Sequence, residues 1–114
     1  MKIYHNPRCR KSRETLQLLE QNGVEADIVL YLQNPPSEAE LADIVQKLGI
    51  RPEQLVRKGE AIYKEQFKGR VLSDEEWVDA MVRFPKLIER PIVIKGDKAV
   101  IGRPPENVLD LVKG

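Results

Sequence analysis

Residues 2–32 read KIYHNPRCRKSRETLQLLEQNGVEADIVLYL, and this stretch decides the fold. A short β-prone run at 2–5 ends at an Asn-Pro pair. A helical segment from about Cys9 to Asn22 follows, and residues 26–32 then have the apolar run of a largely buried strand. A β-α-β segment of this length predicts two parallel strands joined by a right-handed crossover.

The middle of the chain is predicted to be helical. Ser37 followed by Glu40 has the pattern of a capping box at the start of an apolar helical repeat. Ser73 and Glu76 repeat this pattern before a second helix. Between the two helices, residues 52–67 are predicted to form short irregular helix.

The last third of the chain changes to the periodicity of strands. Residues 91–95 and 98–101 predict a hairpin with a two-residue turn of Gly and Asp, and a short helix is expected at about 105–112. The complete order predicts an α/β fold with a mixed four-stranded sheet.

The composition narrows the class of protein. The chain has 114 residues, of which 19 are Lys or Arg and 18 are Asp or Glu, so its formal net charge is +1. This length suits one domain, and the near-zero charge argues against nucleic acid as the main partner. The sequence has neither the run of ~20 apolar residues of a membrane span nor a secretory signal pattern. We therefore expect a cytoplasmic protein that does not bind a membrane.

The chain has one cysteine, Cys9, and one histidine, His5. One thiol cannot form an internal disulfide, and one Cys with one His cannot build an ordinary zinc site of four protein ligands. These counts predict a single free thiol and no metal site. The sequence also has no Gly-rich phosphate loop and no dinucleotide-binding fingerprint, and we expect no bound cofactor.

Cys9 is the candidate nucleophile because it is predicted to lie at or near the N-terminus of a helix. The unpaired N–H groups and partial positive charge of a helix N-terminus stabilise a thiolate. Four of the six residues from 8 to 13 are basic and act in the same direction: Arg8, Arg10, Lys11 and Arg13. The alternative is a buried, inert cysteine, which is the common fate of a free thiol. The surrounding cations favour a reactive thiol.

Ser12 and His5 each have two interpretations. Ser12 completes the pattern Cys-x-x-Ser, in which the hydroxyl can hydrogen-bond a thiolate or cap the helix. His5 can approach the sulfur, or it can be a surface or capping residue. No Asp or Glu lies near enough in the sequence to complete a Cys-His-acid triad, and Thr15 stands where a Cys-x5-Arg phosphatase needs arginine. Papain-type and phosphatase chemistry are therefore not supported.

Three arginines lie at the expected boundaries of elements. Arg57 follows the first of the two capped helices, Arg90 precedes Pro91 at the third strand, and Arg103 follows the fourth strand. Strand ends converge in a small sheet, so Arg90 and Arg103 can point at one place, and guanidinium groups bind tetrahedral oxyanions bidentately. The pattern alone leaves solvated surface charge as the alternative for all three.

Five segments that span nearly the whole chain carry a family resemblance: YHNPRC at 4–9, SRETL at 12–16, LVRK at 55–58, ERPIVI at 89–94 and IGRPPE at 101–106. Together they resemble the ArsC family of glutaredoxin-dependent arsenate reductases. The resemblance implies a single domain over residues 1–114, with a thioredoxin-like fold and a helical insertion at roughly 37–87. It also implies that the Arg90-Pro91 peptide is cis, which only X–Pro bonds adopt at modest cost.

The resemblance also assigns roles to residues of this chain. Cys9 is the nucleophile, and three arginines hold arsenate and the oxyanion intermediates: Arg57, Arg90 and Arg103. Four residues support the site: His5, Asn6, Ser12 and Pro91. Of these, His5 is expected to keep the thiolate charged and Ser12 to hydrogen-bond it. The implied reaction reduces arsenate to arsenite, with glutathione as co-substrate and glutaredoxin as partner, which agrees with a lone thiol that needs a second thiol from another molecule.

One departure and two alternatives accompany this resemblance. Arg10-Lys11 stands where characterised members carry small residues such as Gly-Thr, which puts two extra charges at the mouth of the site. One alternative is a transcription regulator of the Spx type that binds RNA polymerase, although Ser12 removes the Cys-x-x-Cys switch of such proteins. The other is a glutathione-dependent thiol oxidoreductase with another substrate, which differs only in what the arginines bind.

Overall fold

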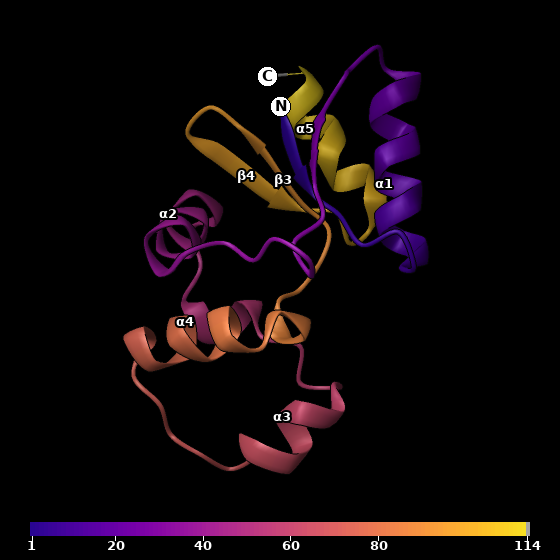
Figure 1. The fold of residues 1–114 in the computed structure, drawn as a ribbon. Helices are drawn as coiled ribbons and strands as arrows, with labels where there is room; N and C mark the ends of the chain where they lie inside the picture. Colours follow the sequence, from indigo (N-terminus) through magenta and orange to yellow (C-terminus); the bar gives the residue numbers. More distant parts are fainter. Residues whose placement is uncertain (114) are drawn as a thin grey trace. The chain divides into compact units, whose positions relative to one another are not determined.

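The computed structural model describes residues 1–113 (Figure 1). The chain falls into two compact units. The sheet unit comprises residues 1–34 and the described residues from 90 onward, and the helical unit comprises residues 35–89. Within residues 1–113, no helix combines the length and the apolar character that crossing a membrane requires.

The sheet unit consists of four strands and the helices that connect or follow them. Its elements are β1 (Lys2–Tyr4), α1 (Arg10–Gln21), β2 (Asp27–Val29), β3 (Ile92–Lys95), β4 (Lys98–Ile101), the 3-10 helix η3 (Pro105–Val108) and α5 (Leu109–Lys113). The strands form one sheet in the order β2-β1-β3-β4. Strand β1 runs parallel to β2 and antiparallel to β3, and β3 pairs antiparallel with β4. The predicted mixed four-stranded sheet, the parallel β-α-β segment and the hairpin are confirmed.

The prediction of a buried strand at residues 26–32 is wrong in both length and burial. Strand β2 has three residues, and none of them is buried. Ile28, at its centre, is 51% exposed. The strand lies at an edge of the sheet, where it has a neighbour on one side only. The buried aromatic residue of this region is Tyr31, which lies in the turn after the strand.

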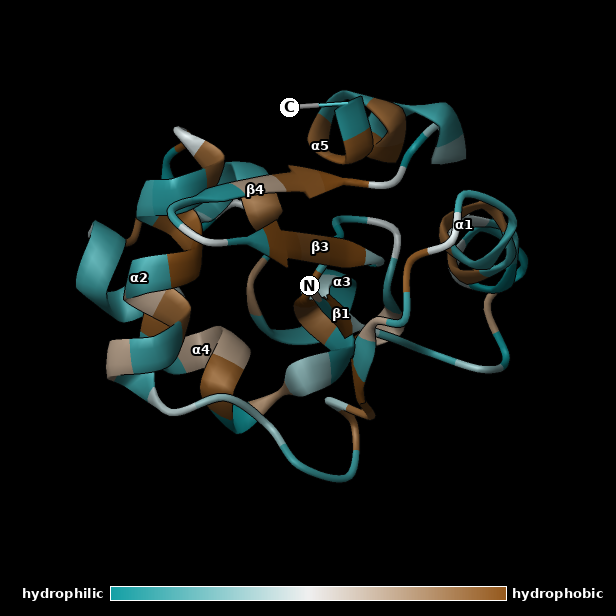
Figure 2. Cartoon of the chain, turned by 90° about the horizontal axis from the view of Figure 1, so that it is seen from above, coloured by the Kyte–Doolittle hydropathy of each residue, from teal (hydrophilic) through white to brown (hydrophobic). Residues whose placement is uncertain are grey.

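The core of the sheet unit lies between the sheet and the helices α1, η3 and α5. Five buried residues, one from each of five elements, form its centre: Ile3, Leu19, Val93, Val108 and Leu111. Figure 2 shows strands β3 and β4 mostly in the colour of hydrophobic residues. Helix α1 buries Ser12, Thr15 and Leu19, which share one face because they are three and four residues apart. Polar side chains therefore enter the core in the first half of α1, near Cys9.

The helical unit contains three α-helices and two 3-10 helices: α2 (Glu38–Leu48), η1 (Pro52–Leu55), α3 (Ala61–Gln66), α4 (Asp74–Arg83) and η2 (Pro85–Leu87). Both predicted capping boxes are present, at Ser37 with Glu40 and at Ser73 with Glu76. The predicted irregular helix at 52–67 appears as η1 and α3. These starts are well defined because each capping box satisfies two backbone donors that a helix N-terminus otherwise leaves unpaired.

Candidate functional site

Cys9 lies at the N-terminus of α1, as predicted. It is the N-cap residue, its backbone is extended, and its side chain is 7% exposed. Its backbone N–H donates to the Asn6 carbonyl at 2.9 Å, and its carbonyl accepts from the Arg13 N–H at 3.0 Å. The loop and the helix therefore hold the backbone of Cys9 on both sides.

The sulfur of Cys9 is contacted by an arginine from the other end of the chain. Arg103 Nη2 lies 3.3 Å from Cys9 Sγ and donates to it, and the two residues are 94 positions apart. Arg103 Nε donates to the Arg90 carbonyl at 2.8 Å, so two nitrogens of the guanidinium are held at once. A cation fixed at hydrogen-bond distance can offset negative charge that develops on the sulfur.

Two of the four basic residues next to Cys9 in sequence, Arg10 and Arg13, pair with groups other than the sulfur. Arg10 pairs with Glu14 at 2.8 Å, and its side chain is 84% exposed. Arg13 Nη1 donates to the Pro7 carbonyl at 2.9 Å, and Arg8 is exposed. These residues were expected to stabilise the thiolate, but the contact with sulfur comes from Arg103.

His5 and Ser12 form a buried hydrogen bond beneath the loop. His5 Nδ1 lies 2.7 Å from Ser12 Oγ, and the Asn6 N–H donates to the same hydroxyl at 3.0 Å. Ser12 is fully buried and His5 is 6% exposed. The hydrogen bonds of residues 1–113 direct the Ser12 hydroxyl to His5 and Asn6, and the interaction of Ser12 with the thiolate stays a prediction.

Burial lowers the pKa of His5, and the positive charge of Arg13 lowers it further. Both effects favour the neutral imidazole over the imidazolium. A neutral imidazole can hydrogen-bond Ser12 but adds no formal charge beside the sulfur. The expected role of His5 in keeping the thiolate charged stays a prediction.

Arg90 and Arg103 converge at the same end of the β3–β4 hairpin, as the strand order predicted. Ile92 and Ile101 are paired in the sheet, so the residues just outside them are neighbours. The predicted cis peptide at Arg90-Pro91 is confirmed, and Arg103-Pro104 is also cis, which the sequence analysis did not predict.

Gly102 joins this end of the hairpin to α1. Its N–H donates to the Pro91 carbonyl at 2.9 Å, and its own carbonyl lies 3.3 Å from Thr15 Oγ1. Thr15 is fully buried and lies on α1, the helix whose N-cap is Cys9. Its hydroxyl donates to the Lys11 carbonyl at 2.8 Å. The backbone that carries Arg103 is thus held against the helix that carries Cys9.

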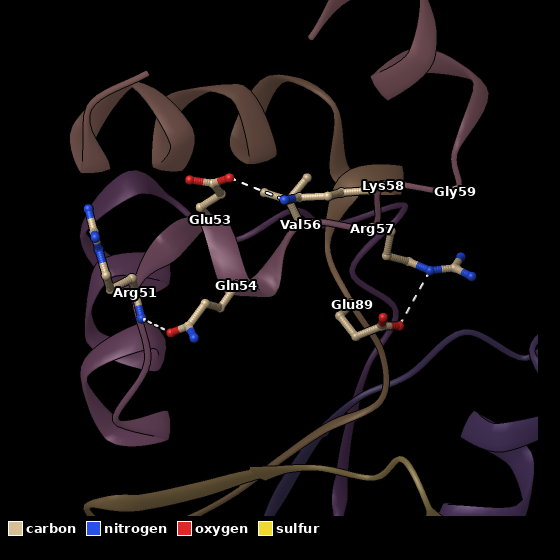
Figure 3. Close-up of a pocket in the computed structure, with 8 residues that line it drawn as sticks. All are labelled: Arg51, Glu53, Gln54, Val56, Arg57, Lys58, Gly59 and Glu89. Atoms are coloured by element: carbon tan, nitrogen blue, oxygen red, sulfur yellow. Dashed lines mark hydrogen bonds and ion pairs between the residues drawn. The ribbon is translucent and has the colours of Figure 1, made fainter. Parts of the chain in front are cut away.

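Arg57 lies in the helical unit. Its Nη1 donates to Glu60 at 2.8 Å, and its Nε lies 3.3 Å from a carboxylate oxygen of Glu89. It lines a pocket of about 670 Å³ with seven other residues: Arg51, Glu53, Gln54, Val56, Lys58, Gly59 and Glu89 (Figure 3). The predicted oxyanion-binding role of Arg57 stays a prediction.

Four residues that organise these groups were not predicted from the sequence. Glu60 has a local signal, because a carboxylate three residues after an arginine lies within reach of it. Glu89 has none, since the Val56–Ile88 bridge brings it to Arg57. Gly102 and Thr15 are adjacent only in the folded chain. Residues 1–113 hold no cluster of three His, Cys, Asp or Glu side chains suited to a metal ion.

Known proteins include relatives that match this chain over nearly its full length and theirs. The model of the ArsC family matches residues 4–111. An arsenate reductase of Haemophilus influenzae is 51% identical over 96% of this chain and 97% of its own length. The uncharacterised protein YfgD of Escherichia coli K12 is 54% identical over 98% of this chain and 96% of its own length.

A solved structure has the same fold. The arsenate reductase from Vibrio cholerae superposes with a TM-score of 0.92 and 48% identity, covering 96% of this chain and 94% of that one. The expected thioredoxin-like α/β fold is therefore confirmed.

Proposed function

We propose that this chain, which belongs to the ArsC family, is an arsenate reductase that converts arsenate to arsenite. It acts as a single domain over residues 1–114, with a helical insertion at roughly 37–87. The observation that carries the proposal is the 3.3 Å contact of Arg103 with the buried Cys9 sulfur at a helix N-terminus. Full-length relatives named arsenate reductase support it.

The proposed roles follow the chemistry of each group. Cys9 is the nucleophile. Three guanidinium groups bind the oxyanion, because their planar donors match its oxygens: Arg57, Arg90 and Arg103. Four residues support the loop around the thiol: His5, Asn6, Ser12 and Pro91. His5 and Ser12 act through the buried hydrogen bond that holds the strand end against α1.

In the first proposed step, the Cys9 thiolate attacks arsenic(V) and forms a sulfur–arsenic bond. One arsenate oxygen takes up protons and leaves as water. Arg90 and Arg103 offset the negative charge of the remaining oxygens during this step. Arg103 already contacts the sulfur, so the same cation stabilises the attacking thiolate and then the adduct that it forms.

In the second proposed step, glutathione supplies the electrons. Its thiolate attacks the sulfur of Cys9, a disulfide bond forms, and the sulfur–arsenic bond breaks. The bonding electron pair stays on arsenic, which leaves as arsenite in the (III) state. A glutaredoxin thiolate then takes the glutathione and restores the Cys9 thiol by disulfide exchange.

External thiols are required because Cys9 is the only cysteine of the chain. Two thiols give up two electrons on forming a disulfide, and this chain provides one. Glutathione is the proposed co-substrate, glutaredoxin the proposed partner, and no bound cofactor is needed. Such chemistry fits the reducing cytoplasm, where thiols are kept reduced.

Turnover of arsenate with glutathione and glutaredoxin tests the proposal. We expect the wild type to be active, Cys9→Ser to be inactive, and Arg103→Ala to lose about 10²-fold or more in kcat, the scale of removing one donor to a developing oxyanion. Arg10→Ala is the matched control, since Arg10 is a cation near Cys9 in sequence that pairs with Glu14. Activity retained by Cys9→Ser, or equal activity with thioredoxin alone, contradicts the proposal.

The same assay separates the two alternatives. Reduction of another glutathione-linked substrate without arsenate turnover favours the general thiol oxidoreductase. Absence of turnover together with co-purification of RNA polymerase favours the transcription regulator.

A further inference from the structure

The guanidinium of Arg57 is held by two carboxylates in the helical unit. Glu60 accepts from Nη1 at 2.8 Å. A carboxylate oxygen of Glu89 lies 3.3 Å from Nε (Figure 3). The three side chains are mostly buried, with exposed fractions of 23%, 28% and 26% for Arg57, Glu60 and Glu89. Partial burial makes these ion pairs stronger than pairs on an open surface.

The backbone fixes all three residues in place. The Arg57 N–H donates to the Leu87 carbonyl at 2.7 Å, and the Glu89 N–H donates to the Leu55 carbonyl at 2.9 Å. These two hydrogen bonds flank the antiparallel β-bridge between Val56 and Ile88, which sets Arg57 beside Glu89. The Glu60 N–H donates to the Arg57 carbonyl at 3.3 Å, which turns Glu60 back toward the guanidinium. The arrangement is therefore built by main-chain pairing.

Two carboxylates on one guanidinium affect its availability to an oxyanion. A guanidinium binds an oxyanion bidentately through Nε with one terminal nitrogen, or through both terminal nitrogens. Glu89 lies at Nε and Glu60 at Nη1, so each of these edges includes a nitrogen that a carboxylate already contacts. The set of one cation and two anions carries a net negative charge, which repels another anion.

We propose that Glu60 and Glu89 form a carboxylate clamp on Arg57, which an incoming oxyanion must displace and which lowers the affinity of the site for oxyanions. This inference rests on the proposed function, in which Arg57 binds arsenate. The clamp weakens the affinity for arsenate and for any other oxyanion that uses Arg57. Removing its charges therefore tightens oxyanion binding, which is the opposite of the result for a residue that merely supports the fold.

Charge-neutral variants test the clamp. We compare Glu60→Gln, Glu89→Gln and the double variant with Glu53→Gln, whose carboxylate lines the same pocket but pairs with Lys58 at 3.2 Å. We expect the KM for arsenate to fall about five-fold in each single variant and further in the double variant, with kcat within about two-fold, because each change removes one negative charge close to the binding cation. Glu53→Gln keeps the wild-type KM.

A second readout separates the clamp from the reaction. Calorimetric titration with arsenate in a Cys9→Ser background measures binding without chemistry. Tighter arsenate binding by the Glu60→Gln, Glu89→Gln double variant than by its Cys9→Ser parent supports the clamp. A complete lack of arsenate turnover beside such tighter binding contradicts the proposed function and leaves the clamp supported. Equal or weaker binding by the double variant, or a higher KM in the turnover assay, overturns the clamp.

Discussion

Gly102→Ala is the substitution for which the structure gives the most definite expectation. A Cβ atom at this position would lie 2.5 Å from Thr15 Oγ1, 2.8 Å from Pro91 Cγ and 2.9 Å from Thr15 Cγ2. Real Cβ atoms essentially never approach other atoms so closely, so something must move. Thr15 is fully buried and Pro91 is a rigid ring in the core, and neither has open space to turn into.

The size of the effect follows from this crowding. Forcing one methyl group into a closely packed core typically costs about 1–3 kcal/mol in the free energy of unfolding. For a chain of 114 residues, a loss of 1 kcal/mol lowers Tm by roughly 4 °C. We therefore expect Gly102→Ala to lower Tm by roughly 4–12 °C. It also displaces the backbone next to Arg103, so arsenate turnover falls beyond what the loss of folded protein explains.

Thermal and denaturant unfolding at fixed pH measure the effect, with Gly59→Ala as the control. A Cβ at Gly59 meets nothing within 4 Å, so that variant should stay within about 0.5 kcal/mol of the wild type. The contact itself is tested by the double-mutant cycle with Thr15→Ala, which removes two of the three crowded atoms. The reasoning is refuted if Gly102→Ala and Gly59→Ala have the same stability, or if Gly102→Ala costs as much with Ala at position 15 as with Thr.

Substitutions at three further positions test other parts of the structure. Burial lowers the pKa of His5, so the folded chain binds this proton less readily than the unfolded chain, and stability should decline as the pH falls below 6.5; urea unfolding of His5→Gln across this range should show a flatter decline. Ser12→Ala leaves the buried His5 ring without its 2.7 Å partner, and it should lower the free energy of unfolding by about 1–3 kcal/mol, measured by chemical denaturation. Ser12→Thr keeps the hydroxyl and should lower it less, and equal losses in the two variants would contradict the role of this hydrogen bond. Ser73→Ala removes the cap of α4 and should lower the free energy of unfolding by about 1 kcal/mol, whereas Ser73→Asp should keep most of that stability. An unchanged free energy of unfolding in Ser73→Ala would show that the cap contributes nothing.

The elements that follow from local chemistry could be predicted from the sequence. The two capping boxes mark the starts of α2 and α4, because a Ser and a Glu three residues apart satisfy the same backbone donors in any context. The hairpin follows from two β-prone runs around a two-residue turn, and Gly96 in that turn has a φ of +61°. The burial of β2 could not be predicted, because an apolar run does not reveal whether a strand lies at the edge of the sheet.

The position of the candidate nucleophile could be predicted from the sequence, but its contacts in the folded chain could be predicted less well. Cys9 at a helix N-terminus follows from local sequence, and so does a neighbouring excess of positive charge. The cation on the sulfur is Arg103, which arrives through the order of the strands and not through sequence proximity. Ser12 binds His5 and Asn6 because the end of β1 returns to the first turn of α1, a contact that spacing alone does not specify.

The central claim is that Cys9 passes electrons from glutathione to arsenate, and trapping its mixed disulfide tests this most directly. Wild-type protein is incubated with arsenate and glutathione in the absence of glutaredoxin, quenched with acid, and measured by intact mass spectrometry. Because the chain has one cysteine, any glutathione adduct that forms as a disulfide must be on Cys9. We predict that this adduct accumulates toward one per chain only when arsenate is present, and that added glutaredoxin removes it. An adduct that forms equally without arsenate, or arsenite production without any adduct, would contradict the account.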